Sequence, residues 1–180
     1  MDEAEKRLRD LAREARDGNR QAFDLLIGHY QTRVMKTALY LTRNLADAED
    51  VAQEVYIKIF RRLPQFKTVR ELDGWIYRVT VNAARDAHRR RRIWSPLKEL
   101  FAAEPSADPV LQREIRNRLL EALSGLSFNE RATFIFKEFH ELPTDEVALI
   151  LGRKAATIRF YLHSARKKLR KSLGDFREHR

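Results

Sequence analysis

The sequence predicts an all-α protein made of two small helical domains joined by a flexible linker. Apolar residues recur at helical spacing almost throughout, as at Val51, Val55 and Ile59, and no stretch shows a convincing strand alternation. Only 5 Pro and 6 Gly occur in 180 residues, too few for a loop-rich sheet protein, while a hydrophobic share of 43% is enough for real cores. The periodicity is lost from residue 93 to residue 109, where three prolines gather.

The first domain is expected over residues 1–92. Its helices are predicted at 3–15, 20–29, 31–43, 47–62 and 72–92, with breaks at Asp17-Gly18, at Asn44 and at Leu63-Pro64. Residues 93–109 follow with Pro96, Pro105 and Pro109, the composition of an extended connector. We therefore place the domain boundary in this stretch.

The second domain is expected over residues 110–180 and begins with a helix at 110–124 that Gly125 ends. The stretch from Ser127 to Glu130 has the pattern of a capping box, so another helix is predicted over 128–140. Pro143 is suited to the start of a third helix, and Gly152 to the left-handed residue that ends it. A last helix is predicted from about 154 to 173.

Composition excludes several classes of protein. There is no Cys, hence no disulfide, thiolate metal site or cysteine nucleophile. The first residues are charged, and no apolar run is long enough to cross a membrane, so we expect a cytoplasmic chain without membrane insertion. No H-E-x-x-H, no Gly-rich phosphate loop and only five scattered His are present. The chain is not expected to be an enzyme, to have catalytic or metal-ligating residues, or to need a cofactor.

The formal charge of +10 is concentrated in two clusters. From Lys58 to Arg92 there are eleven basic residues against three acidic ones, and from Arg153 to Lys171 eight basic residues stand without an acid. An acidic patch around Asp47 and Glu54 precedes the first cluster. Two basic surfaces indicate a polyanion held at two points. The alternative is that both clusters are solvated helix faces.

The second cluster lies in a helix-turn-helix pattern. Gly152 makes the turn, and Ile158 and Leu162 pack the second helix on the first. The opposite face would then present Ala156, Arg159, Phe160, His163, Arg166 and Lys167 to a major groove. Arg159 is the best candidate for reading a base, because a guanidinium can bind guanine through two hydrogen bonds. An ordinary helical hairpin with a basic face is the alternative.

Two ordered motifs resemble one family. Residues 142–152, with Ala156-Thr157-Ile158-Arg159 and residues 162–169, resemble region 4 of the extracytoplasmic-function sigma factors of the bacterial sigma-70 family. Gln21-Ala22-Phe23, residues 47–55 and Trp75-Ile76-Tyr77-Arg78-Val79 resemble region 2 of that family, together with Asn82, Asp86 and Arg89-Arg90. The two regions occur in the family's order and cover about residues 18–92 and 110–173.

The resemblance implies a factor that binds core RNA polymerase and directs it to promoters, acting as a monomer on the polymerase. It implies contacts to the clamp helices of the largest subunit and the flap of the second-largest subunit, and an anti-sigma protein as inhibitor. The residues that it assigns to polymerase binding are Asp47, Asp50, Gln53 and Glu54. Those that it assigns to the minus-10 element are Phe66, Lys67, Arg70, Arg78, Asn82, Arg85, Arg89 and Arg90. Those that it assigns to the minus-35 element are Lys154, Thr157, Arg159, Phe160, His163, Arg166 and Lys167.

The chemistry of the minus-10 residues agrees with these roles. Opening DNA requires a place where an unstacked base is stacked and hydrogen-bonded, and the loop from Leu63 to Arg70 is where the family has such a pocket. Phe66 can form its wall, and Asn82 matches the Asn that contacts a flipped base. Trp75 is expected to be a core residue, whereas the role of Tyr77 stays open. Asp47 and Asp50 can alternatively be simple helix caps.

The chain also departs from the family pattern. Pro143 stands where a capping Ser or Thr is common, and Phe160 stands where a small or basic residue is usual. The preferred minus-35 sequence is therefore not predictable from the resemblance. A stand-alone helix-turn-helix regulator is the alternative function; it accounts for the second half equally well and leaves the first half unexplained.

Overall fold

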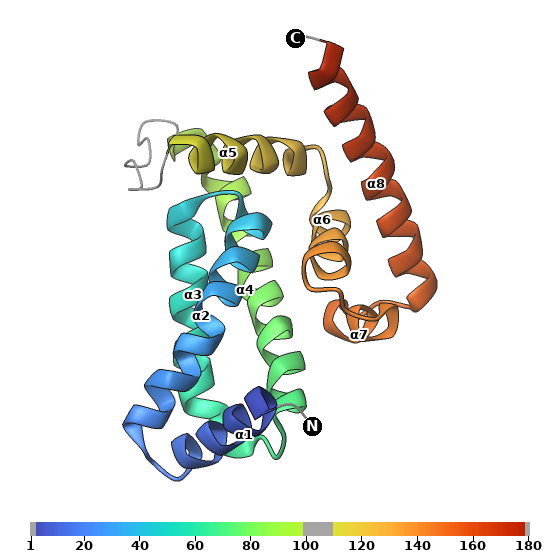
Figure 1. Cartoon of the computed structure of the whole chain (residues 1–180). Coiled ribbons are helices and arrows are strands. Elements are labelled where there is room, and N and C mark those ends of the chain that lie inside the picture. The colour runs from blue at the N-terminus through green and yellow to red at the C-terminus, as the bar shows by residue number, and fades with distance from the viewer. Residues whose placement is uncertain (1–2, 99–109, 179–180) are drawn as a thin grey trace.

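The computed structural model describes residues 3–98 and 110–178, and the regular elements in these two ranges are all helical (Figure 1). In chain order they are α1 (Glu3–Arg16), α2 (Arg20–Thr42), α3 (Leu45–Arg62), the 3-10 turn η1 (Leu63–Gln65), α4 (Val69–Lys98), α5 (Val110–Ser124), α6 (Phe128–Phe134), the π turn η2 (Ile135–Phe139), α7 (Thr144–Leu151) and α8 (Ala155–Glu178). The predicted all-α class is confirmed for the described residues.

α2, α3 and α4 lie side by side as a bundle, and α1 crosses one end of it (Figure 1). The stripe of Val51, Val55 and Ile59 that predicted α3 is fully buried. Leu26 and Leu41 of α2 are fully buried as well and belong to the same core. The apolar period of each helix therefore marks the face that it turns to the bundle interior.

Asparagine side chains cap the starts of α2 and α3. Oδ1 of Asn19 accepts a hydrogen bond from the Ala22 amide at 3.1 Å, and Oδ1 of Asn44 accepts one from the Asp47 amide at 2.9 Å. Each bond satisfies an amide that has no partner inside its own helix. Arg43 ends α2 with a left-handed φ of 60°, which lets the chain turn directly into α3.

Three expected helix boundaries in the first half are wrong. The predicted break between 20–29 and 31–43 does not exist, because Tyr30 is fully buried and its hydroxyl donates to Asp73 Oδ1 of α4 at 2.6 Å. This burial outweighs the low helix propensity of Gly28. α4 begins at Val69 instead of residue 72 and reaches Lys98, so residues 93–98 of the predicted linker are helical. Residues 99–109 of that linker lie outside the described residues.

The second half confirms the local signals for its helix ends and corrects one helix. The Ser127 hydroxyl and the Glu130 carboxylate form the predicted capping box, and Gly152 ends α7 with a φ of 62°. Pro143 precedes α7 and makes no side-chain capping bond. The helix predicted over 128–140 keeps α geometry only to Phe134 and then widens into the π turn η2.

The two halves pack against each other. α7 lies against α4, and α6 contacts α2. The ring of Tyr77 in α4 lies 5.2 Å from the ring of Phe136 and 5.0 Å from that of His140. One buried cluster therefore contains residues of both halves. A second cluster connects α5 with α8; its buried members are Ala122, Leu123, Leu126, Ala165 and Leu169.

Candidate nucleic-acid interface

Four polar side chains form a stripe along α4. Arg78, Asn82, Arg85 and Arg89 follow each other at intervals of four, three and four residues, which keeps them on one face of the helix. Arg85 is half-buried, and the other three are exposed. Nη1 of Arg85 donates to Asn82 Oδ1 at 3.2 Å, which orients the amide. Arg90 is exposed next to Arg89, which forms an ion pair at 3.3 Å with Asp86 of the same helix, so the stripe and Arg90 together are cationic on balance.

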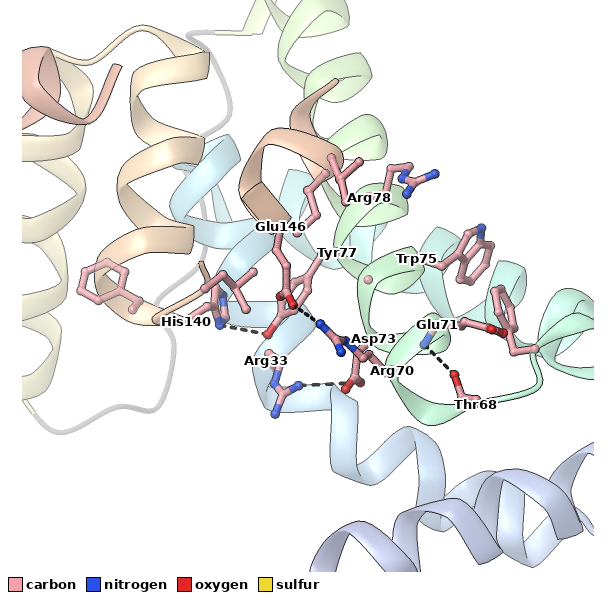
Figure 2. Close-up of a pocket in the computed structure, with 16 residues that line it drawn as sticks. Arg33, Thr68, Arg70, Glu71, Asp73, Trp75, Tyr77, Arg78, His140 and Glu146 are labelled. Atoms are coloured by element: carbon pink, nitrogen blue, oxygen red, sulfur yellow. Dashed lines mark hydrogen bonds and ion pairs between the residues drawn. The ribbon is translucent and has the colours of Figure 1, made fainter. Parts of the chain in front are cut away.

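A pocket of about 960 Å³ opens where the loop before α4 meets the second half (Figure 2). Phe66 and Trp75 form one wall, with their ring centroids 5.0 Å apart. Trp75 is half-buried and packs on the bundle core, and it also lines this pocket. Tyr77, whose role the sequence left open, is buried in the core. Aromatic walls next to Arg70 and other cations are the surroundings in which an unpaired base can stack.

Two cations of the minus-10 set contact the second half of the chain. Nη2 of Arg70 donates to Oε1 of Glu146 in α7 at 3.0 Å, as Figure 2 shows. The guanidinium of Arg85 lies 5.3 Å from the ring centre of Phe128 in α6. The Arg70 side chain is 89% exposed, so its ion pair contributes little by itself. Arg85 belongs to the α4 stripe, so a nucleic acid bound along the stripe would compete with its contact to Phe128.

Lys67 belongs to the same loop and is exposed. Its backbone amide donates to Oε2 of Glu71 at 3.1 Å, and the Glu71 amide donates to Thr68 Oγ1 at 3.2 Å. These bonds fasten the loop to the first turn of α4, leaving the Lys67 side chain to project into solvent. The loop thus presents a positive charge next to the aromatic wall.

The outer face of α8 is exposed as predicted. Ile158, Ala165 and Leu169 are buried, which directs the opposite side of the helix to solvent. The exposed members are Ala156, Arg159, Phe160, His163, Arg166 and Lys167. Lys154, in the turn before α8, is exposed as well, whereas Thr157 is half-buried. The exposed minus-35 candidates therefore lie on one side of the first half of α8 and, with Lys154, in the turn before it.

Carboxylates of the second half hold two cations of α8. Oε1 of Glu138 accepts from Nε and Nη2 of Arg166 at 3.1 and 2.6 Å, so this predicted DNA contact is paired within its own domain. Glu130 accepts from Ser164 Oγ at 2.6 Å and from Lys168 Nζ at 2.7 Å. Burial alone would raise the pKa of Glu130, but the hydrogen bonds from Lys168, Ser164 and Ser127 outweigh it and hold the pKa at about 2. Sequence reasoning identified only the capping role of Glu130.

The polymerase-binding candidates lie on α3. Asp50 and Gln53 are exposed, and Glu54 is half-buried and paired with Lys58. Asp47 forms an ion pair at 3.3 Å with Arg91 of α4, consistent with a role in helix packing.

Two large apolar residues extend the exposed face of α3. Ile57 and Phe60 are 45% and 67% exposed, and Phe60 stacks edge-on against Phe23 of α2 at 5.2 Å. Sequence reasoning missed both residues. The detectable signal was their position off the Val51, Val55 and Ile59 stripe, on the side of Asp50 and Gln53. We call Asp50, Gln53, Ile57 and Phe60 the outer face of α3.

Two absences hold for the described parts of the chain. The residues placed there bring together no group of three or more side chains suited to bind a metal ion. None of the helices described is long and apolar enough to span a membrane.

Comparison with known proteins identifies the family. The sequence profile of Sigma-70 region 2 matches residues 26–93, and that of Sigma-70, region 4 matches residues 116–169. The first match contains α3 and the α4 stripe, and the second contains the helix-turn-helix. The two matched regions therefore coincide with the two cationic surfaces.

Curated relatives agree with the profiles. The chain is 32% identical over 165 residues to the Probable RNA polymerase sigma factor RfaY of Xanthomonas campestris pv. campestris, covering 87% of this chain and 41% of RfaY. It is 31% identical over 156 residues to the ECF RNA polymerase sigma factor SigE of Mycolicibacterium smegmatis, covering 83% of this chain and 60% of SigE. The chain thus spans only two fifths to three fifths of these two relatives. With SigW of Bacillus subtilis, also an ECF RNA polymerase sigma factor, it shares 23% identity over 95% of this chain and 99% of SigW.

Solved structures share the fold. CnrH, in complex with the cytosolic domain of CnrY, matches with a TM-score of 0.72 and 22% identity over 94% of this chain and 98% of CnrH. The sigma factor RpoE, in complex with the anti-sigma factor NepR from Bartonella quintana, matches with a TM-score of 0.69 and 22% identity over 84% of this chain and 96% of RpoE. With both region profiles matched in order, the chain belongs to the extracytoplasmic-function group of the sigma-70 family.

Proposed function

We propose that the chain is a promoter-specificity subunit of RNA polymerase. It binds the core enzyme, reads minus-35 duplex with the outer face of α8, and captures the non-template strand of the minus-10 element along the α4 stripe. The polymerase supplies the synthesis, and the chain itself contributes no catalytic group. Its domains are a region 2 unit up to about residue 92 and a region 4 unit from about residue 110, with the intervening residues as the connection.

One observation carries the proposal: a single chain presents two exposed cationic helix faces with different chemistry. The α4 stripe combines arginines with an amide and leads to the aromatic wall of Phe66 and Trp75, which suits a single strand with an extruded base. The α8 face has the dimensions and donors for a major groove. A stand-alone helix-turn-helix regulator needs only the second of these.

Core polymerase is proposed to bind the outer face of α3. This face combines the acidic and amide groups of Asp50 and Gln53 with the exposed apolar side chains of Ile57 and Phe60. Exposed aromatic and aliphatic residues surrounded by polar ones are typical of protein interfaces. The clamp helices of the largest subunit are the proposed partner here, and the flap of the second-largest subunit is the proposed partner of the region 4 unit.

An anti-sigma protein is proposed as a further partner. The RpoE structure with NepR gives one case of a protein of this fold bound by such an inhibitor. In this chain, Leu149 and Phe139 at the rim of the pocket are 71% and 45% exposed. An apolar segment of an inhibitor that covered them would also hold α7 against α4.

The test is transcription in vitro with purified core polymerase and a library of promoter-like templates. Adding the chain is expected to create new start sites that share two sequence elements, and gel filtration is expected to show a one-to-one complex with the core enzyme. A chain that leaves start sites unchanged and does not associate with polymerase contradicts the proposal. Binding of the free chain to paired duplex half-sites as a dimer would favour the regulator instead.

A further inference from the structure

Carboxylates hold α8 on two opposite flanks. On one flank, Lys168 Nζ lies 2.7 Å from Glu130 Oε2, and the hydroxyl of Ser164 lies 2.6 Å from Glu130 Oε1. On the other, Nη2 of Arg166 lies 2.6 Å from Glu138 Oε1. Residues two apart on an α-helix are about 200° apart around its axis. The side chains of Arg166 and Lys168 therefore leave α8 in nearly opposite directions, and each meets an acid.

The exposed face of α8 lies between these flanks. At 100° per residue, the arc between Arg166 and Lys168 that faces away from the buried Ile158 contains the exposed Arg159, Phe160, His163 and Lys167. Rotation of α8 that shortened one carboxylate contact would lengthen the other. The two contacts together are satisfied at one rotational setting, and that setting decides which side chains face outward.

Glu130 is the firmer of the two acids. Its side chain is 7% exposed, and Oε2 also accepts from the Ser127 amide at 2.8 Å as part of the capping box. The Glu130 side chain cannot move away without leaving the Ser127 amide without its partner. Glu138 is 33% exposed and holds Arg166 through two hydrogen bonds to one oxygen.

We propose that Glu130 and Glu138 are positioning residues for promoter reading, which fix the rotation of α8 and withhold Lys168 and Arg166 from the DNA backbone. This inference rests on the proposed function, in which α8 binds the minus-35 duplex. A free cation that neutralises a phosphate adds affinity for every sequence alike. Each such contact steepens the slope of log affinity against log salt concentration by about 0.9. The two acids therefore suppress sequence-independent binding and leave recognition to the arc of Arg159, Phe160, His163 and Lys167.

The experiment compares Glu130→Gln and Glu138→Gln in the full chain bound to core polymerase. The probes are a random-sequence duplex and a minus-35 duplex that the parent holoenzyme selects from a random pool. Between about 50 and 200 mM salt, each variant is expected to lose roughly threefold more affinity for the random duplex than the parent does, because one more phosphate contact is made. Because the rotation of α8 is then no longer fixed, the ratio of selected to random binding is expected to fall as well.

Glu121→Gln is the matched control, because it removes the same charge from an exposed position of α5. It should leave the salt slope unchanged. Adding Lys168→Gln to Glu130→Gln, or Arg166→Gln to Glu138→Gln, should return the slope to the parent value. Glutamine at position 130 keeps an acceptor for the Ser127 amide, and thermal melting checks that each variant folds. If Glu130→Gln does not fold, the test uses Glu138→Gln, because Glu138 lies at the surface.

Two results overturn the inference. If Glu130→Gln and Glu138→Gln fold and show the same salt slope as Glu121→Gln, the two acids withhold no cation from the DNA. Loss of selected and random binding in parallel, at the parent slope, would mean a structural role alone. A parent holoenzyme that binds the selected duplex no better than core polymerase does would instead overturn the proposed function, and with it the premise of this inference.

Discussion

Thr37 of α2 and His140, which follows the π turn η2, are joined by a hydrogen bond of fixed direction. Oγ1 of Thr37 donates its one hydrogen to the Arg33 carbonyl at 2.7 Å, so at 2.8 Å it accepts from the Nε2–H of His140. Nδ1 of the neutral ring then lies 3.4 Å from the Tyr77 hydroxyl as an acceptor. The link between the two halves thus uses one tautomer of an uncharged histidine.

This link predicts that acid weakens the packing of the two halves. Burial, reinforced by the nearby charge of Arg33, lowers the pKa of His140 from 6.5 to about 4. The contribution of the neutral ring is complete above its ordinary pKa of 6.5 and is lost as pH falls toward 4. At about pH 5.5 the packing should be weaker by about 1 kcal/mol than at about pH 7.5.

The measurement is energy transfer between dyes on cysteines introduced at Arg62 and Lys171, which is simple because the chain has no Cys. In the parent, the urea concentration at which the dyes separate should decrease as the pH is lowered. It should be nearly constant in His140→Gln, which keeps a donor for Thr37 but does not titrate. An equal shift in both proteins would assign the effect to other groups.

The outer face of α3 predicts a defect in polymerase binding without a defect in folding. Phe60→Ala removes a side chain that is 67% exposed, so it should change the free energy of unfolding little while weakening the complex with core polymerase by about 1–2 kcal/mol. The control is Phe160→Ala on α8, where the ring is 66% exposed. Calorimetric titration with core enzyme should separate the two, and equal affinities would remove Phe60 from the interface.

The two cationic surfaces predict different defects in initiation. Arg159→Ala should relax sequence preference at one minus-35 position by about 1–3 kcal/mol, which a promoter library would report as a loss of information at that base pair. Asn82→Ala should leave duplex binding nearly intact and impair strand opening, as measured by permanganate reactivity of unpaired thymines. The same pattern of defects from both changes would contradict a division of labour between α4 and α8.

Replacing the buried Arg131 of α6 with methionine is predicted not to destabilise the protein. Its side chain is 1% exposed, and its Nε and Nη1 atoms have no hydrogen-bond partner. Burial, with Arg43 nearby, lowers the pKa of Arg131 to about 10. Arg131→Met keeps most of the volume and removes a buried unpaired charge, so the free energy of unfolding should stay equal or rise by about 1–3 kcal/mol.

Urea denaturation measures this effect, with Arg131→Ala as the control for volume. The alanine variant should be less stable than the methionine variant by about 2 kcal/mol, because it leaves a cavity. A methionine variant clearly less stable than the parent would show that the guanidinium is stabilising where it lies.

The local patterns of the sequence were sufficient for the all-helical class, the capping box at Ser127, the helix end at Gly152 and the exposed face of α8. Ser127 and Gly152 act on the residues next to them, and the apolar period of a helix reports its own buried side. These signals need no knowledge of what the helix packs against. The family resemblance, which rests on the same local motifs, was confirmed for the same reason.

The tertiary structure alone decided how these elements meet. α2 is continuous because Tyr30 is buried against α4, where its partner Asp73 lies 43 residues away in the chain. Arg70 reaches Glu146 across 76 residues, Arg166 reaches Glu138 across 28 and Lys168 reaches Glu130 across 38. Helical periodicity marks which face of a helix is buried but not which distant residue faces it, because that depends on how the packed helices are placed in space. The partners of these cations are therefore a property of the folded chain.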